Sequence, residues 1–355
     1  MSDSDRLHIT FNSIIGSVGI IIGLISLGIA PSLIWQTLGI SLVAIGLWRL
    51  VKAALRFFRQ PSPYHPSKPV TPPDFVGRKS LLRQMIQALE NGESLSIVGD
   101  QKMGKTSLLK TWQQQVQTTK RVVVFVDGLQ IETTLPAFIQ AITEQTTPDN
   151  PDKAADILKD WVIASVTQTG LSPLLLIDNA EHFLEQLDMR FFERLRGMLD
   201  KCVVIFATSR EMNRIFADMG KTSPLALRIF HIDLLDEPSS EDIIAHGHFT
   251  AQQIEFIKEW AGQHPFYLQS LGQNLIDARQ DGESDEKALR HFRTNAKARF
   301  TKLWATLTES EQRILQTACQ KNEPIQRDSL KERGLVTEEG LLFGRVFKEW
   351  LLERE

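Results

Sequence analysis

The chain has 355 residues, a length that favours roughly two or three domains. Its composition, with 42% hydrophobic and 23% charged residues, excludes a wholly disordered or collagen-like protein. The formal net charge of −3 gives no global electrostatic reason to bind nucleic acid, and the two cysteines are too few for a disulfide framework.

The most hydrophobic part of the chain lies at its N-terminal end. Residues 11–30 and 32–48 carry no formal charge, and Pro31 separates the two stretches. Because a bilayer span needs about 20 apolar residues, we predict a two-span transmembrane hairpin within residues 1–60. A cleaved signal peptide and a buried soluble helix pair are the alternatives.

Positive charges follow the second stretch at Arg49, Lys52, Arg56 and Arg59. This excess predicts a membrane protein with both termini facing the cytoplasm and the lipid bilayer as a partner. Gly19 and Gly23 form a GxxxG pattern that would pack helices either within one hairpin or between protomers. Residues 61–74 are rich in proline, which predicts a semi-rigid extended linker without regular secondary structure.

A phosphate-binding motif follows this linker. The apolar run 94–98 predicts a strand, and it leads into Gly99-Asp-Gln-Lys-Met-Gly104-Lys105-Thr106, a G-x-x-x-x-G-K-[ST] motif. The loop would wrap the phosphates of ATP or ADP, and Lys105 would reach the β- and γ-phosphates. The Thr106 hydroxyl would ligate Mg²⁺. The remaining loop residues expected at the nucleotide are Asp100, Gln101, Lys102, Met103 and Ser107.

Further apolar runs predict a parallel sheet covered by helices, an α/β fold of the P-loop NTPase class. These strands are expected at 122–126, 174–177 and 203–207. Polar residues stand where they end: Asp127 after the first, Asp178 after the second, and Ser209 and Arg210 after the third. Since ligands of such sheets bind at the carboxyl ends of the strands, Asp178 is expected to hold the Mg²⁺ ion.

These motifs, together with Phe75-Val-Gly-Arg78 and Trp260-Ala-Gly-Gln-His-Pro-Phe266, resemble the STAND and Orc-like branch of AAA-type P-loop ATPases over roughly residues 75–350. The resemblance implies that Phe75, Val76 and Gly77 lie near the adenine, and that Ser209 and Arg210 lie near the γ-phosphate. It also implies that Gly262, His264 and Pro265 form the element through which a helical lid closes on the nucleotide. For Pro265 a plain helix start is the alternative.

One position departs from the family pattern. The residue directly after the Walker B aspartate is commonly acidic, to polarise the attacking water, and here it is Asn179. Glu181 either takes over that role or is a surface helix residue. Because a missing base costs about 10²–10⁴-fold in rate, we expect slow hydrolysis.

The expected organisation has five parts. They are a transmembrane hairpin (1–60), a linker (61–74), a P-loop domain (75–236), a helical lid (237–295) and a winged-helix-like domain (296–355). Basic residues in the expected recognition helix, such as Arg333, alternate with acidic ones, and Glu338 and Glu339 occupy the wing tip. A solvated face of mixed charge is therefore favoured over DNA binding.

The sequence predicts a membrane-anchored, slowly hydrolysing ATP switch whose nucleotide state controls homo-oligomerisation and a membrane effector action. The alternatives are a membrane-tethered DNA-binding or scaffold ATPase, and a degenerate module that nucleotide only holds together. Arg194 and Arg196 would act on a neighbour's nucleotide or belong to a surface helix. The activating partner is not identified by the sequence.

Overall fold

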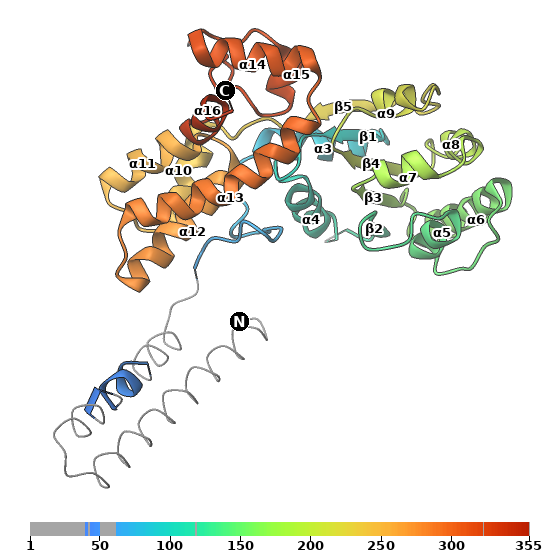
Figure 1. The fold of residues 1–355 in the computed structure, drawn as a ribbon. Coiled ribbons are helices and arrows are strands. Elements are labelled where there is room, and N and C mark those ends of the chain that lie inside the picture. Colours follow the sequence, from blue (N-terminus) through green and yellow to red (C-terminus); the bar gives the residue numbers. More distant parts are fainter. Residues whose placement is uncertain (1–39, 42, 50–61, 118, 322, 355) are drawn as a thin grey trace. The chain divides into compact units, whose positions relative to one another are not determined.

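The computed structural model describes residues 40, 41, 43–49, 62–117, 119–321 and 323–354 (Figure 1). The chain divides into two compact units, Met1–Pro61 and Ser62–Glu355. The described residues of the first unit are helical. The second unit contains the P-loop and all other motifs that carry chemistry.

The structure does not support the predicted transmembrane hairpin. No helix in the described ranges is both long and apolar enough to cross a bilayer. The longest of these, α13 (Asp285–Ala305), has 21 residues but carries charges along its length, whereas a span needs about 20 consecutive apolar residues. The predicted spans, 11–30 and 32–48, lie mostly outside the described residues. We correct the fold class to an α/β P-loop fold for the described residues, and we withdraw the transmembrane hairpin, the membrane localisation and the bilayer as a partner.

A five-stranded parallel sheet forms the centre of the second unit, with strand order β2-β3-β4-β1-β5. The strands are β1 (Leu95–Val98), β2 (Val123–Asp127), β3 (Leu174–Asp178), β4 (Val203–Thr208) and β5 (Arg228–His231). The parallel α/β sheet is therefore confirmed. Sequence reasoning missed β5, an edge strand whose first two residues are exposed and which lacks a continuous apolar run.

Helices cover both faces of the sheet (Figure 1). Side chains alternate along each strand, so Leu174 and Leu176 enter one core while Leu175 and Ile177 enter the other. The first core lies under α3 (Lys79–Glu90) and α4 (Lys105–Val116). The second lies under α5 (Leu135–Thr143), α6 (Pro151–Thr169), α7 (Glu181–Gln186), α8 (Met189–Arg196) and α9 (Met212–Asp218).

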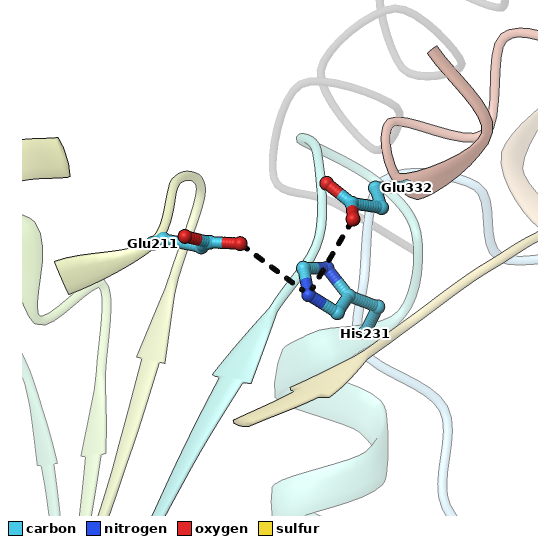
Figure 2. A group of neighbouring side chains, drawn as sticks. All are labelled: Glu211, His231 and Glu332. Carbon is cyan, nitrogen blue, oxygen red and sulfur yellow. Dashed lines mark ion pairs between the residues drawn. The ribbon is translucent and has the colours of Figure 1, made fainter. Parts of the chain in front are cut away.

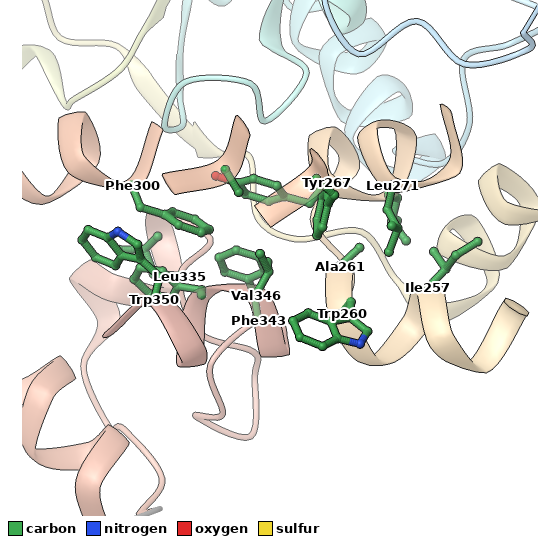
Figure 3. Packing of buried hydrophobic residues seen from close by; sticks show 14 of the residues in the cluster. Ile257, Trp260, Ala261, Tyr267, Leu271, Phe300, Leu335, Phe343, Val346 and Trp350 are labelled. Carbon is green, nitrogen blue, oxygen red and sulfur yellow. The ribbon is translucent and has the colours of Figure 1, made fainter. Parts of the chain in front are cut away.

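The remaining helices share a third core. They are α10 (Glu237–Ala245), α11 (Ala251–Ala261), α12 (Pro265–Asp281), α13, α14 (Glu309–Lys321), α15 (Asp328–Glu332) and α16 (Arg345–Leu352). Aromatic rings fill its middle, where Tyr267, Phe300, Phe343 and Trp350 gather (Figure 3). Because α13 continues across residue 295, one rigid element joins the lid to the following segment. The predicted boundaries inside residues 75–355 stay a prediction.

The described residues of the proline-rich segment, 62–74, form no helix or strand, yet hydrogen bonds at Tyr64 and Val70 hold the segment against other elements of the second unit. The buried Tyr64 donates its hydroxyl proton to the carbonyl oxygens of Ile243 (3.0 Å) and Ile244 (2.9 Å) at the end of α10. Further along, the Val70 amide donates to Ser107 Oγ (3.0 Å) in the first turn of α4. The segment therefore ties the helical lid to the P-loop helix.

Candidate nucleotide-binding site

The P-loop connects β1 to α4 and encloses the Lys105 side chain. Gly104 precedes the helix with φ 96°, a left-handed conformation that favours glycine. Lys105 Nζ donates to the carbonyl oxygens of Gly99 (2.8 Å) and Asp100 (3.2 Å). Burial lowers the pKa of Lys105, and the charges of Glu181, Asp178 and Asp100 oppose this. The loop thus holds a buried cation where phosphate would bind.

A hydroxyl and a carboxylate meet beside this lysine. Thr106 Oγ1 donates to Asp178 Oδ2 at 2.5 Å, and Asp178 is fully buried. Burial raises the pKa of Asp178, whereas the Thr106 hydrogen bond and the Lys105 charge lower it. Asp178 Oδ1 and Glu181 Oε2 are buried without a hydrogen-bond partner among the described residues. Since Mg²⁺ prefers such oxygen ligands, Thr106 and Asp178 fit the ion that the sequence predicts here.

Most of the predicted site residues line one cavity of about 520 Å³, which we call the P-loop cavity. They are Phe75, Val76, Gln101, Lys102, Met103, Gly104, Lys105, Thr106, Ser107, Glu181 and Pro265. They come from the residues just after the proline-rich segment, from the P-loop, from α7 and from α12. The fold therefore brings residues of the lid to the same cavity as the P-loop. The cavity also includes Asp127 and Asn179, to which sequence reasoning assigned no binding role.

Other predicted residues lie elsewhere. Gly77, with φ 78°, packs against Ser239, and Gly99 packs against Ile232. Asp100, Ser209 and Arg210 line a second cavity, of about 710 Å³, to which Lys102 also contributes.

Arg210, the predicted γ-phosphate arginine, is engaged in ion pairs with Asp218 (2.6 Å) and Glu185 (3.6 Å). A strand-end arginine can simply pair with nearby carboxylates, and Arg210 does so here. Reaching a phosphate would require it to leave these two partners.

Pro265 combines the two interpretations of its motif. It is the first residue of α12, where its missing N–H costs nothing, and it also lines the P-loop cavity. His264 caps the helix by accepting a hydrogen bond from the Phe266 amide at Nδ1 (3.2 Å), and burial lowers its pKa to about 3. Gly262 lies against the backbone of Phe343 and leaves no room for a Cβ atom. The motif therefore positions the C-terminal segment as well as the lid.

Arg333 reaches the P-loop from the end of α15. Its guanidinium forms an ion pair with Asp100 Oδ2 (Nη2, 3.0 Å; Nε, 3.1 Å) and also donates to Thr306. Both side chains are less than one-fifth exposed. An arginine of the expected recognition helix thus contacts the phosphate-binding loop of the same chain. Its basic charge was visible in the sequence, but its partner 233 residues away was not.

A second polar contact joins the same helix to the sheet (Figure 2). His231 Nε2 at the end of β5 lies 3.6 Å from Glu211 and 3.9 Å from Glu332 of α15. Glu211 in turn lies 3.8 Å from Arg214. With Arg333, this cluster fixes α15 at two points beside the carboxyl ends of β1 and β5.

Asn179 occupies the position where the family pattern has an acid. Its backbone is left-handed, with φ 50°, and its side-chain amide donates to Asp127 Oδ1 at 2.8 Å. The residue therefore connects the ends of β3 and β2. On α8, Arg194 pairs with Asp156 (2.5 Å) and Arg196 is exposed, as in a surface helix, and their action on a neighbouring protomer stays a prediction.

The fold and the P-loop geometry define the class of protein, and a sequence comparison agrees. Residues 88–216 match the family described as AAA domain. The chain therefore contains an AAA-type P-loop ATPase domain, a class that implies nucleotide binding and usually Mg²⁺. No curated protein matches the chain in this comparison.

Among solved structures, the chain is similar to a Walker-type ATPase of Pyrococcus abyssi. The two share 15% identity with a TM-score of 0.55, and the alignment covers 83% of this chain and 99% of that chain. A likeness at this identity concerns the fold alone. Drosophila ORC bound to DNA matches at 18% identity, covering 43% of this chain and 88% of that chain. The TM-score of this match is only 0.34, so we draw no structural conclusion from it.

Proposed function

We propose that this protein is an ATP-binding, slowly hydrolysing switch of the STAND or Orc-like type, whose nucleotide state controls the docking of its C-terminal segment and its self-association. The observation that carries the proposal is the ion pair between Asp100 and Arg333. It connects the loop that binds phosphate directly to a helix outside the nucleotide-binding domain. A phosphate group added at this loop would compete with Asp100 for the arginine.

In this proposal Lys105 and the P-loop amides bind the β- and γ-phosphates. Thr106 and Asp178 hold Mg²⁺, which when bound neutralises the charge that develops on the phosphates. Phe75, Val76 and the neighbouring proline-rich segment form the wall beside the base. Because the segment is anchored to the lid at Tyr64 and to α4 at Ser107, it would transmit lid movement to the base.

Slow turnover is expected because Asn179 carries no charge and cannot accept a proton from water as a carboxylate at this position does. A base at another position is less directly aligned with the attacking water, and a misplaced or missing base costs up to about 10²–10⁴-fold in rate. A long-lived ATP state suits a switch, which must persist long enough to be recognised.

The test is particle mass by light scattering with ADP and then with a non-hydrolysable ATP analogue, beside nucleotide binding by calorimetry. We expect a discrete increase in mass with the analogue only, and loss of binding in Lys105→Ala. The matched control is Lys153→Ala, an exposed lysine of α6. Unchanged mass in both nucleotide states would count against the switch, whereas binding by Lys105→Ala would show that the phosphates lie elsewhere.

DNA binding by the C-terminal segment receives less support. Arg333 is engaged by Asp100, and Lys331 lies 3.9 Å from Glu338 of the wing. Filter binding of DNA across a series of salt concentrations separates DNA binding from the nucleotide switch. Contacts to DNA phosphates make the affinity for DNA fall steeply as salt rises. A degenerate module would instead show only a lower melting temperature when the site is emptied.

A further inference from the structure

Asp127, at the end of β2, lines the P-loop cavity and has no role so far. We propose that Asp127 accepts the proton of the water that attacks the γ-phosphate, in place of the acid missing at position 179. This inference rests on the proposed ATP hydrolysis. Asp127 comes 52 residues before Asn179 in the chain, so no local sequence pattern connects them.

The sheet register brings Asp127 beside the magnesium ligand. β2 and β3 are parallel neighbours, and Asp127 pairs directly with Asp178. Adjacent strands lie about 4.8 Å apart, so two side chains at paired positions are close neighbours. The negative charge of Asp127 accordingly contributes to raising the pKa of Asp178. Both carboxylates lie at the carboxyl ends of strands, where ligands of parallel sheets bind.

Hydrogen bonds orient the Asp127 carboxylate. Its Oδ1 accepts from Asn179 Nδ2 (2.8 Å) and from the Leu129 amide (3.0 Å). Within the described part of the chain, Oδ2 has no hydrogen-bond partner and is free to meet a water molecule. Gly128 makes this arrangement possible, because a Cβ atom there would lie 2.5 Å from the Asn179 carbonyl oxygen. Asn179 thus serves as a positioning residue for the neighbouring acid.

Asp74 and Glu181 are the other acids that line the cavity. Asp74 is exposed on the linker, and the surroundings of Glu181 differ from those of Asp127. The charge of Glu181 is the strongest of those acting on the buried ammonium of Lys105. A carboxylate that balances a buried lysine supports the phosphate-binding cation. Asp127 lies on the opposite side of Asp178 in the sheet order, away from β1, and no lysine or arginine forms an ion pair with it among the described residues. We therefore assign charge balance to Glu181 and proton acceptance to Asp127.

The proposed step conserves atoms and electrons. The water oxygen forms a bond to the γ-phosphorus while one of its protons moves to Asp127 Oδ2. The bond between the γ-phosphorus and the bridging oxygen breaks, and its electron pair leaves with ADP. Asp127 then releases the proton to solvent, which restores the carboxylate.

The experiment compares single-turnover ATP hydrolysis and ATP affinity in wild type, Asp127→Asn, Asn179→Ala and Glu181→Gln. Asparagine at 127 keeps an Oδ1 acceptor for both hydrogen bonds, so the variant removes the charge and retains the geometry. We expect a loss of about 10²-fold or more in rate for Asp127→Asn, with ATP affinity within about twofold of wild type. Asn179→Ala should lose about tenfold, since the acid remains but is less well oriented. Asp160→Asn, an exposed aspartate of α6, is the matched control with unchanged rate.

A rate for Asp127→Asn within about threefold of wild type, or a larger loss in Glu181→Gln, overturns the inference. Wild type that binds ATP without hydrolysing it also overturns the inference but leaves the switch standing. Wild type that does not bind ATP refutes the proposed function itself.

Discussion

The contacts on the two sides of the P-loop have different origins in the sequence. On one side, Lys105 and Thr106 meet Asp178 and line the P-loop cavity. On the other, Asp100 meets Arg333, which arrives from the C-terminal segment. The first side consists of motif residues that any P-loop domain needs. The second depends on contacts that this chain makes between distant segments.

The two sides also differ in their proposed roles: the first binds and hydrolyses the nucleotide, and the second controls the docking of the C-terminal segment. A nucleotide-binding face must be rigid before the ligand arrives, and buried hydrogen bonds supply that rigidity. A controlling contact must be able to break, so it should contribute only a small free energy. The Asp100–Arg333 pair meets this requirement, since one partly buried ion pair is small beside the total stability of a domain.

The largest effect is expected on the chemical side. Asp178→Asn should spare nucleotide binding, because Lys105 and the P-loop amides remain, but remove Mg²⁺-dependent turnover. Losing the metal's charge stabilisation should lower the rate by about 10²-fold or more. ATP hydrolysis measured across a Mg²⁺ series checks this. Equal turnover in wild type and variant would show that another residue holds the metal.

The next effect concerns the docking of the C-terminal segment. Gly262 has φ 57°, and a Cβ atom there would meet the Phe343 carbonyl oxygen at 1.4 Å. Gly262→Ala should therefore lower the free energy of unfolding by about 3 kcal/mol or more. Gly282→Ala is the matched control, because Gly282 has φ 67° but nothing within 4 Å of the added atom. Urea denaturation that shows equal losses would contradict the docking role.

Acid should weaken the same interface through His264. The folded protein keeps this buried imidazole neutral down to about pH 3, while the unfolded chain takes up the proton near the ordinary value of 6.5. The unfolded state therefore binds more protons between these limits, and the free energy of unfolding falls as pH is lowered below 6.5. Between pH 7.5 and 5.0 the His264 contribution should be about 2 kcal/mol.

This pH effect is measured by urea denaturation at both pH values in wild type and His264→Asn. Asparagine can still cap α12 but does not titrate. The variant should lose about 2 kcal/mol less than wild type on acidification. His291→Asn, at an exposed position of α13, controls for removing a histidine. An equal pH dependence in wild type and His264→Asn would exclude this histidine as the cause.

The smallest expected effect is on the controlling side. Arg333→Gln should lower the free energy of unfolding by about 1–2 kcal/mol, since it removes charge-assisted hydrogen bonds that are partly buried. It should also lower affinity for the ATP analogue about fivefold, because the phosphate loses the arginine for which it competes with Asp100, the effect of about 1 kcal/mol of coupling. Arg345→Gln removes an exposed pair with Glu259 and should cost less than about 1 kcal/mol. An unchanged analogue affinity in Arg333→Gln would remove the basis of the switch.

Local patterns predicted the elements well where a strand is buried on both sides. β3 and β4 each appear in the sequence as an uninterrupted apolar run, because parallel strands are covered on both faces. Of two helix starts that local patterns indicate, one agrees with the structure and one does not. The spacings Ser239-x-x-Asp242 and Thr250-x-x-Gln253 both predict helix starts of the capping-box type. Thr250 and Gln253 do form the capping box of α11, whereas α10 is capped by Asp236, three residues before Ser239. Pro238 suits the first turn of that helix and allowed the earlier start.

The residues of the candidate site also fall into those that the sequence predicts and those that only the structure reveals. The sequence alone determined Lys105, Thr106 and Asp178, because the spacing of the motif and an acid at a strand end fix their places relative to the P-loop. Only the tertiary structure decided that Arg210 pairs with Asp218, that Arg333 contacts Asp100 and that Asn179 orients Asp127. A residue's charge is visible in the sequence, but its partner depends on sheet order and on how helices pack across tens to hundreds of residues.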